Sequence, residues 1–401
     1  MRRRSLVGLL LVVLLPLILN PAGGDPVSPG YAFARLSGPY ADSVIGWMAR
    51  STLDKVVDAA RSQDSAGVDV PAFFRLAGRA ARLNELAFEP SRADASQVGA
   101  PTKELPSLES ELDGLSPGVE SLLQKQVGAA LADAGLGYPL AGRLFPPLFF
   151  RFEALPKLLV VSPRSRIDRV GAVLLRPDIT VADAERIEAD VSSKGYSALV
   201  TQIGGLGVYP SMVPESSDLQ ETLRTVAHEW THQFLAFRPL GWRYAFGAEG
   251  DARMVTINET AAEIVGREIG DEVYLKYYAA GQPPATGRSP REQRFRQLMR
   301  EIRVRVDGLL AEGRVDEAEG YMEQARSDLA RQGYYLRKLN QAYFAFYGNY
   351  ADDPSMASRV GRDIAARIHA LRDRSPSLGD FLWKVSSAGS YAEFLKLAPA
   401  P

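Results

Sequence analysis

Between residues 217 and 236 apolar side chains recur three or four positions apart, which is the spacing of an α-helix. The repeat consists of Leu219, Leu223, Val226, Trp230 and Phe234. These positions fall on one side of a helix, so the pattern predicts a helix with a core-facing side and a polar side opposite. Ser217, with Gln220 three residues later, is typical of a capping box and is the expected N-cap of this helix.

Shorter apolar runs upstream of this helix predict β-strands. The runs are Leu158–Val161, Val170–Leu175 and Ser197–Ile203. Between the second and third runs, Thr180 to Lys194 has the pattern of a helix that ends at Gly195. Strands and a helix that precede the long helix near residue 225 predict an α+β fold with a small mixed sheet.

Most of the remaining chain has helical spacing. Residues 31–89 and 119–136 are expected to be helical, whereas residues 90–118 are rich in Ser, Pro, Gly and acidic side chains and predict a linker or long surface loop. After Gly270 we expect helices at residues 271–280, 290–310, 315–348, 355–372 and 377–387. No apolar run after residue 20 is long enough to span a membrane.

The N-terminus has the pattern of an export signal. Arg2, Arg3 and Arg4 precede an apolar run from Leu6 to Leu19, and residues 20–24 follow as a stretch of small residues. The run is shorter than the roughly 20 residues of a spanning helix, which favours removal over a permanent anchor. We therefore expect an exported, extracytoplasmic protein that is secreted or attached to the membrane by residues 1–24.

The composition narrows the classes of function. The 401 residues carry a formal net charge of -1, and a chain so nearly neutral lacks the basic surface of a nucleic-acid-binding protein. Cysteine is absent, which excludes disulfides, cysteine-ligated zinc and thiol catalysis.

The polar side of the predicted helix carries the residues with the clearest chemistry. His228 and His232 are four positions apart, so both imidazoles lie on the same face and reach one metal ion. Glu229 follows His228 and lies beside such an ion, where a carboxylate can take a proton from water. The apolar stripe lies on the opposite side of this helix.

Downstream, Glu259 and Glu263 share a face of a helical stretch that is expected to begin at Asn258. Two histidines and one carboxylate leave a fourth tetrahedral position for water, as in catalytic zinc sites. Glu259 is the expected third ligand, and Glu263 is one turn further along, where a carboxylate accepts the spare N–H of a ligating histidine.

The segments HEWTH and NETAAE resemble the gluzincin clan of zinc metallopeptidases, over residues 217–269. The resemblance implies one zinc ion held by His228, His232 and Glu259, with Glu229 as general base and Glu263 orienting His228. It also implies a gluzincin-like catalytic domain. More loosely, residues 339–354 resemble bacterial gluzincins that are described as predicted aminopeptidases.

Several further residues could have either a functional or a purely structural role. The run Gly204–Pro210 either lets an extended substrate approach an edge strand, as in the clan, or is a flexible turn. Tyr350, Tyr347 and Tyr244 are candidate donors to the oxyanion, and each is also a plausible structural tyrosine. His369 lies outside any motif and is interpreted as solvent-facing or structural.

The expected function is zinc-dependent hydrolysis of peptide bonds in a peptide or protein substrate. Residues 25–118 form a helical N-terminal region and linker, as an accessory layer or a prosegment. Residues 119–270 form the metallopeptidase catalytic domain, and residues 271–401 form a helical C-terminal domain. The alternatives are another zinc hydrolase, or a non-enzymatic cell-envelope module that retains the fold.

Overall fold

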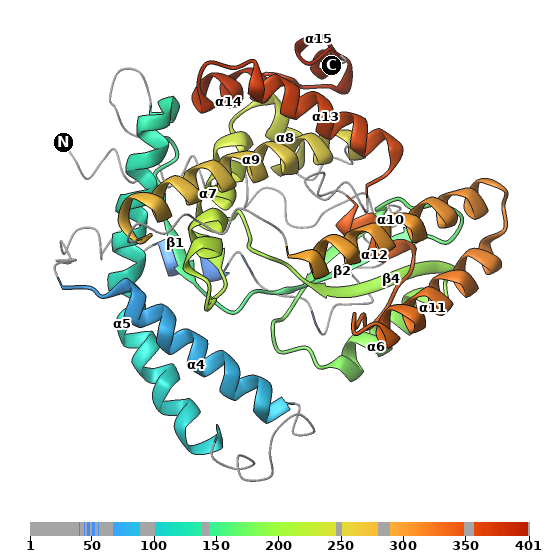
Figure 1. Cartoon of the computed structure of the whole chain (residues 1–401), viewed down its shortest axis with the longest axis horizontal. Helices are drawn as coiled ribbons and strands as arrows, with labels where there is room; N and C mark the ends of the chain where they lie inside the picture. The colour runs from blue at the N-terminus through green and yellow to red at the C-terminus, as the bar shows by residue number, and fades with distance from the viewer. Residues whose placement is uncertain are drawn as a thin grey trace.

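The computed structural model describes Tyr40 and scattered positions up to Lys55, then residues 67–88, 101–137, 144–245, 251–279, 289–348 and 357–399. The expected export segment, residues 1–24, lies outside the described residues. The described chain is mostly helical with a small sheet, which confirms the predicted α+β class (Figure 1). No helix in these ranges is both long and apolar enough to cross a membrane.

The main sheet is antiparallel. β2 (Lys157–Pro163) lies between β3 (Gly171–Leu175) and β4 (Tyr196–Gln202), and these are the three strands expected from the apolar runs. β1 (Phe150–Phe152) and β5 (Ser211–Val213) form a separate parallel pair. The prediction of one mixed sheet was wrong, because the parallel pairing joins two three-residue strands that are too short to stand out as apolar runs.

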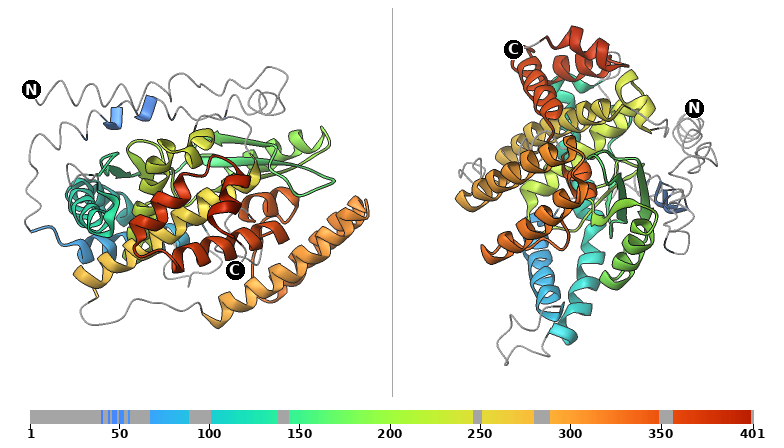
Figure 2. Two further views of the ribbon diagram at one scale, coloured as in Figure 1. Left: turned by 90° about the horizontal axis from the view of Figure 1, so that it is seen from above. Right: turned by 90° about the vertical axis from the view of Figure 1, so that its right-hand side faces the viewer.

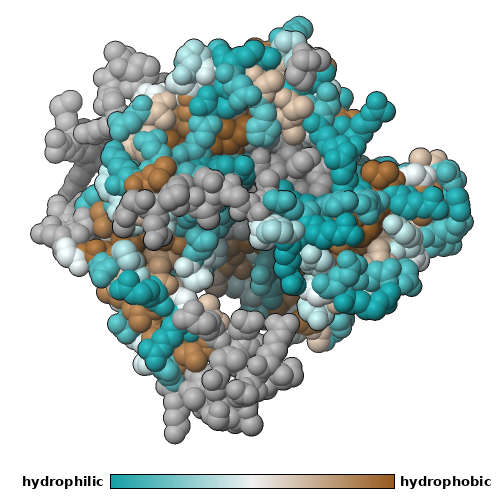
Figure 3. Space-filling view, viewed as in Figure 1, coloured by the Kyte–Doolittle hydropathy of each residue, from teal (hydrophilic) through white to brown (hydrophobic). Residues whose placement is uncertain are grey.

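Helices cover both faces of the antiparallel sheet. Leu159, Val161 and Val200 pack with α6 (Val181–Ser192), which begins after the N-cap Thr180 as predicted. Val160 and Leu199 point to the opposite face, since side chains alternate along a strand. That face packs against α10 (Pro290–Ala311), α11 (Val315–Arg331) and α12 (Gln341–Tyr347). The outer surface over α10 and α11 is strongly hydrophilic (Figure 3).

The second helix of a helical hairpin begins inside the segment 90–118, for which the sequence predicts a loop. α4 (Val70–Phe88) packs against α5 (Pro101–Leu131), which leads into a π-helical turn, η3 (Ala132–Leu136). The loop prediction was wrong for residues 101–118. α5 contains Pro106 and Pro117, but its buried leucines at 108 and 112 share a core with Phe73. This packing outweighs the low helix propensity of proline.

The long helix predicted near residue 225 is α7 (Leu219–Ala236). Its N-cap is Asp218, whose carboxylate accepts from the backbone N–H of Glu221 at 3.0 Å, so the Ser217–Gln220 capping box was wrong by one residue. A carboxylate one position later is the better cap here because it reaches that N–H directly. Trp230 and Phe234 are buried, as the apolar stripe predicts.

The second helix of the motif is longer than the sequence predicts. α9 runs without a break from Ala252 to Tyr277, so the predicted start at Asn258 and the separate helix at 271–280 were both wrong. Gly270 does not end the helix because it lies against α7: a Cβ there would be 2.6 Å from the backbone nitrogen of Arg224. Gly266 lies nearly as close, and a Cβ at that position would be 2.8 Å from the Arg224 carbonyl oxygen.

The C-terminal helices join two different cores. The predicted helix at 315–348 is broken into α11 and α12, with Gly333 at φ +86° after the first and Asn340 capping the second. The cluster that contains α7 and α9 also holds residues of α13 (Arg359–Asp373), α14 (Leu378–Ser386) and α15 (Tyr391–Leu397). A short helix, α8 (Pro239–Ala245), lies between α7 and α9 in the chain. The strands lie on one side of the molecule and α9, α10 and α13 on the other (Figure 2).

A buried ion cluster closes the outer edge of β4. Glu188, which is 1% exposed, binds Arg337 and Lys338 and accepts from the backbone N–H of Val200 at 2.6 Å. Arg337 also donates to the carbonyl of Val200, at 2.8 Å. Asn340 donates to the carbonyl of residue 198, also at 2.8 Å. These side chains occupy the backbone groups at which another strand would otherwise pair.

Gly270→Ala tests the close approach of α7 and α9. The added methyl group collides with backbone, so we expect it to lower the free energy of unfolding by about 1–3 kcal/mol in a urea titration. Gly320→Ala is the matched control: Gly320 lies inside α11 with no atom within 4 Å of the new Cβ, and alanine should stabilise the protein by about 0.5–1 kcal/mol. Two variants of equal stability would contradict the close helix contact.

Glu188→Gln tests the cluster at the β4 edge. Burial alone would raise the pKa of Glu188, but the hydrogen bonds from Arg337 and Val200 and the charge of Lys338 lower it below its ordinary 4.5. A lowered pKa contributes stability above about pH 4.5 that is lost as the pH falls through the folded-state pKa. The difference in unfolding free energy from wild type should therefore be largest near pH 7, about 3 kcal/mol or more, and shrink below pH 4.5.

The exposed Glu185 on the same helix supplies the control, and Glu185→Gln should change the unfolding free energy by less than about 0.5 kcal/mol. A constant difference between wild type and Glu188→Gln across this pH range would rule out the charge of Glu188 as the source of the stabilisation.

Candidate metal centre

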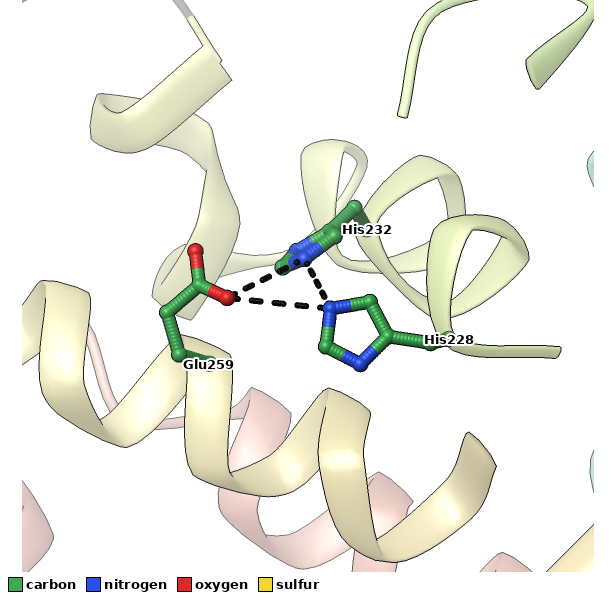
Figure 4. Close-up of side chains that lie close together, drawn as sticks. All are labelled: His228, His232 and Glu259. Atoms are coloured by element: carbon green, nitrogen blue, oxygen red, sulfur yellow. Dashed lines mark hydrogen bonds and ion pairs between the residues drawn. The ribbon is translucent and has the colours of Figure 1, made fainter. Parts of the chain in front are cut away.

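Three of the predicted site residues converge where α7 crosses α9. Nε2 of His228 lies 3.0 Å from Nε2 of His232. One carboxylate oxygen of Glu259 lies 3.7 Å from Nε2 of His228 and 3.6 Å from Nε2 of His232. Figure 4 shows the two imidazoles from one helix and the carboxylate from the other pointing at a common space.

The spacing of these atoms suits a metal ion. A tetrahedral ion with bonds of about 2.0–2.2 Å has ligand atoms about 3.3–3.6 Å apart. The three distances of 3.0, 3.6 and 3.7 Å bracket that value, so one ion can contact all three atoms with small side-chain adjustments. Among the described residues this is the group of histidine and acidic side chains that fits an ion, and it consists of two half-buried imidazoles and one buried carboxylate.

Glu263 faces the outer nitrogen of His228. Its carboxylate lies 3.6 Å from Nδ1, an ion-pair distance slightly too long for a hydrogen bond, and it also binds Arg267 at 3.0 Å. This is the position from which a carboxylate orients a ligating histidine, the role expected for Glu263 from the sequence.

Asn258 is a site residue that the sequence reading did not single out. Its Oδ1 lies 2.8 Å from Nδ1 of His232, and the residue is 1% exposed. An amide oxygen only accepts, so Nδ1 carries the proton and Nε2 is left free for a metal. The sequence did contain a clue to this role, because Asn258 directly precedes the candidate ligand Glu259.

Glu229 lies beside the cluster and is not part of it. The residue is 5% exposed, and its carboxylate has no hydrogen-bond partner among the residues that the structure describes. Burial is the main cause that raises the pKa of Glu229; Glu259 raises it further, and the two imidazoles act in the opposite direction. A buried carboxylate next to a metal site without a structural partner is free to exchange a proton.

The electrostatics of the cluster favour a cation. Burial would raise the pKa of Glu259, but the imidazoles of His232 and His228 hold it well below its usual range. Burial would lower the pKa of His228, yet Glu259 and Glu263 raise it well above its ordinary value. The carboxylates therefore attract positive charge, and a metal ion that binds must displace a proton.

The glycine-rich run after β4 packs directly on the site. A Cβ on Gly205 would collide with the Glu229 carboxylate, and one on Gly207 would lie 2.8 Å from Cβ of His232. Gln233 holds this run in place by donating from Nε2 to the carbonyl of Val208 and to Oγ of Ser211, the latter at 2.8 Å. The two glycines therefore allow this segment to lie directly against the side chains of Glu229 and His232 on α7.

The remaining candidates do not join the cluster. The hydroxyl of Tyr347 lies 3.0 Å from Oγ1 of Thr201, which ties α12 to β4. Tyr350 and the side chain of Tyr244 lie outside what the structure describes. His369 is exposed on α13, in keeping with its solvent-facing interpretation.

Comparison of the chain with protein-family models, with curated proteins and with solved structures found no match.

Removing either histidine should abolish metal binding. Purified protein should hold about one divalent metal ion per chain, and His228→Ala or His232→Ala should lose it, because two ligand atoms retain an ion poorly. Asn258→Ala should weaken the affinity about 10–100-fold, since the ring of His232 loses its orienting partner. The metal content of each variant is measured by elemental analysis after dialysis against increasing concentrations of a chelator.

His369→Ala, which removes the third histidine of the chain, is the control and should bind metal like wild type. Full metal content in both single-histidine variants would refute the proposed ligand set.

Proposed function

We propose that the protein is a zinc-dependent hydrolase of peptide bonds, with Glu229 as general base. The proposal is based mainly on two features of α7. Two of its imidazoles point at the Glu259 carboxylate on α9, and the buried carboxylate of Glu229 beside them binds no other described side chain. A purely structural metal site has no need of such a carboxylate.

The donor set favours zinc over hard divalent cations. Two imidazoles and one carboxylate at these distances form a three-ligand site, and catalytic zinc sites keep three protein ligands with one open position. Hard cations such as Mg²⁺ and Ca²⁺ prefer sites made of oxygen atoms. The absence of cysteine also leaves histidine and carboxylate as the zinc ligands that this chain can offer.

When bound, zinc supplies a Lewis acid that polarises a carbonyl group and makes water a better nucleophile near neutral pH. Glu229 accepts a proton from the attacking water and delivers it to the nitrogen of the leaving amine. The burial that raises the pKa of Glu229 suits both transfers, because a general base works best when its pKa lies near the working pH.

The path of the substrate is limited by the ion cluster at β4. The outward groups of residues 198 and 200 are already bonded to Glu188, Arg337 and Asn340, so an extended peptide cannot pair there. The backbone from Gln202 to Gly207 follows directly and passes over Glu229. We place the substrate along this second stretch, where backbone pairing and the site meet.

The peptide character of the substrate and the place of action rest on the sequence. The resemblance of HEWTH and NETAAE to gluzincins supports peptide-bond hydrolysis, and the basic and apolar N-terminus supports export. The proposed substrates are accordingly peptides or proteins outside the cytoplasm.

Glu229→Gln separates catalysis from metal binding. Glutamine keeps the size of the side chain but cannot accept the proton, so cleavage of a peptide library should fall by roughly 10²–10⁴-fold while metal content stays unchanged. Mass spectrometry of the digest gives the rates. Glu221→Gln, an exposed carboxylate two turns earlier on α7, is the control and should cleave like wild type.

Wild-type cleavage by metal-loaded Glu229→Gln would show that the assigned base is wrong. If the metal-loaded wild type cleaves no member of the library, the peptidase proposal itself fails, and another hydrolase or a binding module is favoured.

A further inference from the structure

A second feature near the metal centre is a cavity of about 200 Å³ between α9, α10, α12 and α13. The loop between β2 and β3 also lines it. Three arginines, Arg169, Arg253 and Arg303, contribute to its wall, together with a single carboxylate, Asp168. We call this space the arginine cavity.

Two of the arginines are already paired with carboxylates outside the wall. Arg303 is 4% exposed and donates from Nε to both oxygens of Asp307, at 2.9 and 3.0 Å. Arg253 makes a bidentate pair with Asp251, at 2.5 to 2.9 Å. Their contacts fix both guanidinium groups in place and partly balance their charge.

Arg169 is different. Its guanidinium has neither a hydrogen-bond nor an ion-pair partner within the part of the chain that the structure describes, although it lines a partly enclosed space. The carboxylate on the wall, Asp168, is bound to Arg166 at 3.3 Å. Counting only the residues that the structure describes, the cavity therefore carries one uncompensated positive charge.

The N-terminus of α13 adds to this charge. Ser358, the N-cap, and Gly361 both line the cavity, and the first turn of a 15-residue helix carries partial positive charge on its free N–H groups. Arginine, helix N-terminus and partial enclosure together favour an anion, and a planar guanidinium favours a carboxylate or phosphate.

The cavity and the candidate metal centre share helix α9. Sites that take a whole small molecule occupy roughly 300–1,000 Å³, so 200 Å³ suits one group of a larger ligand. Thr256 and Arg253 on its wall precede Glu259 by one and two turns of α9, about 4.5 and 9 Å along the helix axis. At about 3.3 Å per residue, the α9 wall of the cavity therefore lies roughly one to three extended peptide residues from Glu259 along the helix axis.

We propose that the arginine cavity binds a carboxylate of the peptide substrate, through Arg169. The carboxylate is either the C-terminus of the peptide or an acidic side chain, and the two sources share this chemistry. This inference rests on the proposed peptidase function for the identity of the ligand.

Equilibrium binding of three peptides tests the proposal without requiring turnover. The peptides are N-acetyl-tetra-alanine as free acid, the same peptide as an amide, and an amide with glutamate as the third residue. Metal-loaded full-length Glu229→Gln is titrated with each in a calorimeter. At least one charged peptide should bind about 10–100-fold more tightly than the neutral amide, and which one does so identifies the source of the carboxylate.

Arg169→Ala, added to the same background, should bring the three affinities to within about three-fold, and Arg169→Lys should keep part of the preference. Arg176→Ala is the matched control: Arg176 is an exposed arginine after β3 that is paired with Asp178, and its loss should leave the preference intact. Unchanged thermal unfolding of Arg169→Ala shows that the effect is on binding and not on the fold.

Three results would overturn the proposal: equal affinity for all three peptides, a carboxylate preference that survives Arg169→Ala, or no binding of any peptide. Cleavage of the neutral amide by wild type, measured separately, tests the peptidase function. A protein that cleaves this amide but shows no carboxylate preference fails only the cavity proposal, and one that binds carboxylates but cleaves nothing fails only the peptidase proposal.

Discussion

The close contact between α7 and α9 is the constraint on which the site depends. Glu259, Glu263, Gly266 and Gly270 recur at intervals of four, three and four residues, so they form one stripe along α9. The glycine half of the stripe touches the backbone of α7 around Arg224, and a Cβ at Gly266 would also lie 3.0 Å from Cβ of His228. The carboxylate half can reach the imidazoles only because the glycine half allows the helices to approach this closely.

The rest of the fold fixes the rotation of α7 and covers its polar side. Trp230 and Phe234 are buried on the side opposite the histidines, so turning the helix would expose them to solvent. Gln233 binds the segment that leads from β4 to β5 and holds it against Glu229. One helix thus carries a core stripe, two of the proposed metal ligands, the proposed proton acceptor and the anchor of the segment above it.

The sequence predicts best those features that depend on neighbours in the chain. The three strands of the sheet, α6 and the pairing of His228 with His232 follow from local periodicity and spacing. The choice of Glu259 rests on the NETAAE segment and its resemblance to gluzincins, and the structure brings the three side chains together. Features that depend on tertiary contacts were missed. α5 forms despite its prolines because α4 packs on it, and Gly270 continues a helix because α7 lies against it.

Within the site, and in the arginine cavity, the features that the sequence does not predict are likewise those that depend on tertiary contacts. The role of Asn258 and the packing of Gly205 on Glu229 require two elements to be placed relative to each other. The arginine cavity gathers residues from five segments, which no local pattern reveals.

The position of a bound ion tests the central claim most directly. Crystals of the protein grown with zinc, with diffraction data measured on both sides of the zinc absorption edge, would locate the metal without reference to activity. The account predicts one strong anomalous peak per chain, at about 2.0–2.2 Å from Nε2 of His228, Nε2 of His232 and a carboxylate oxygen of Glu259. A peak bound elsewhere, or none between α7 and α9 at saturating zinc, would contradict it.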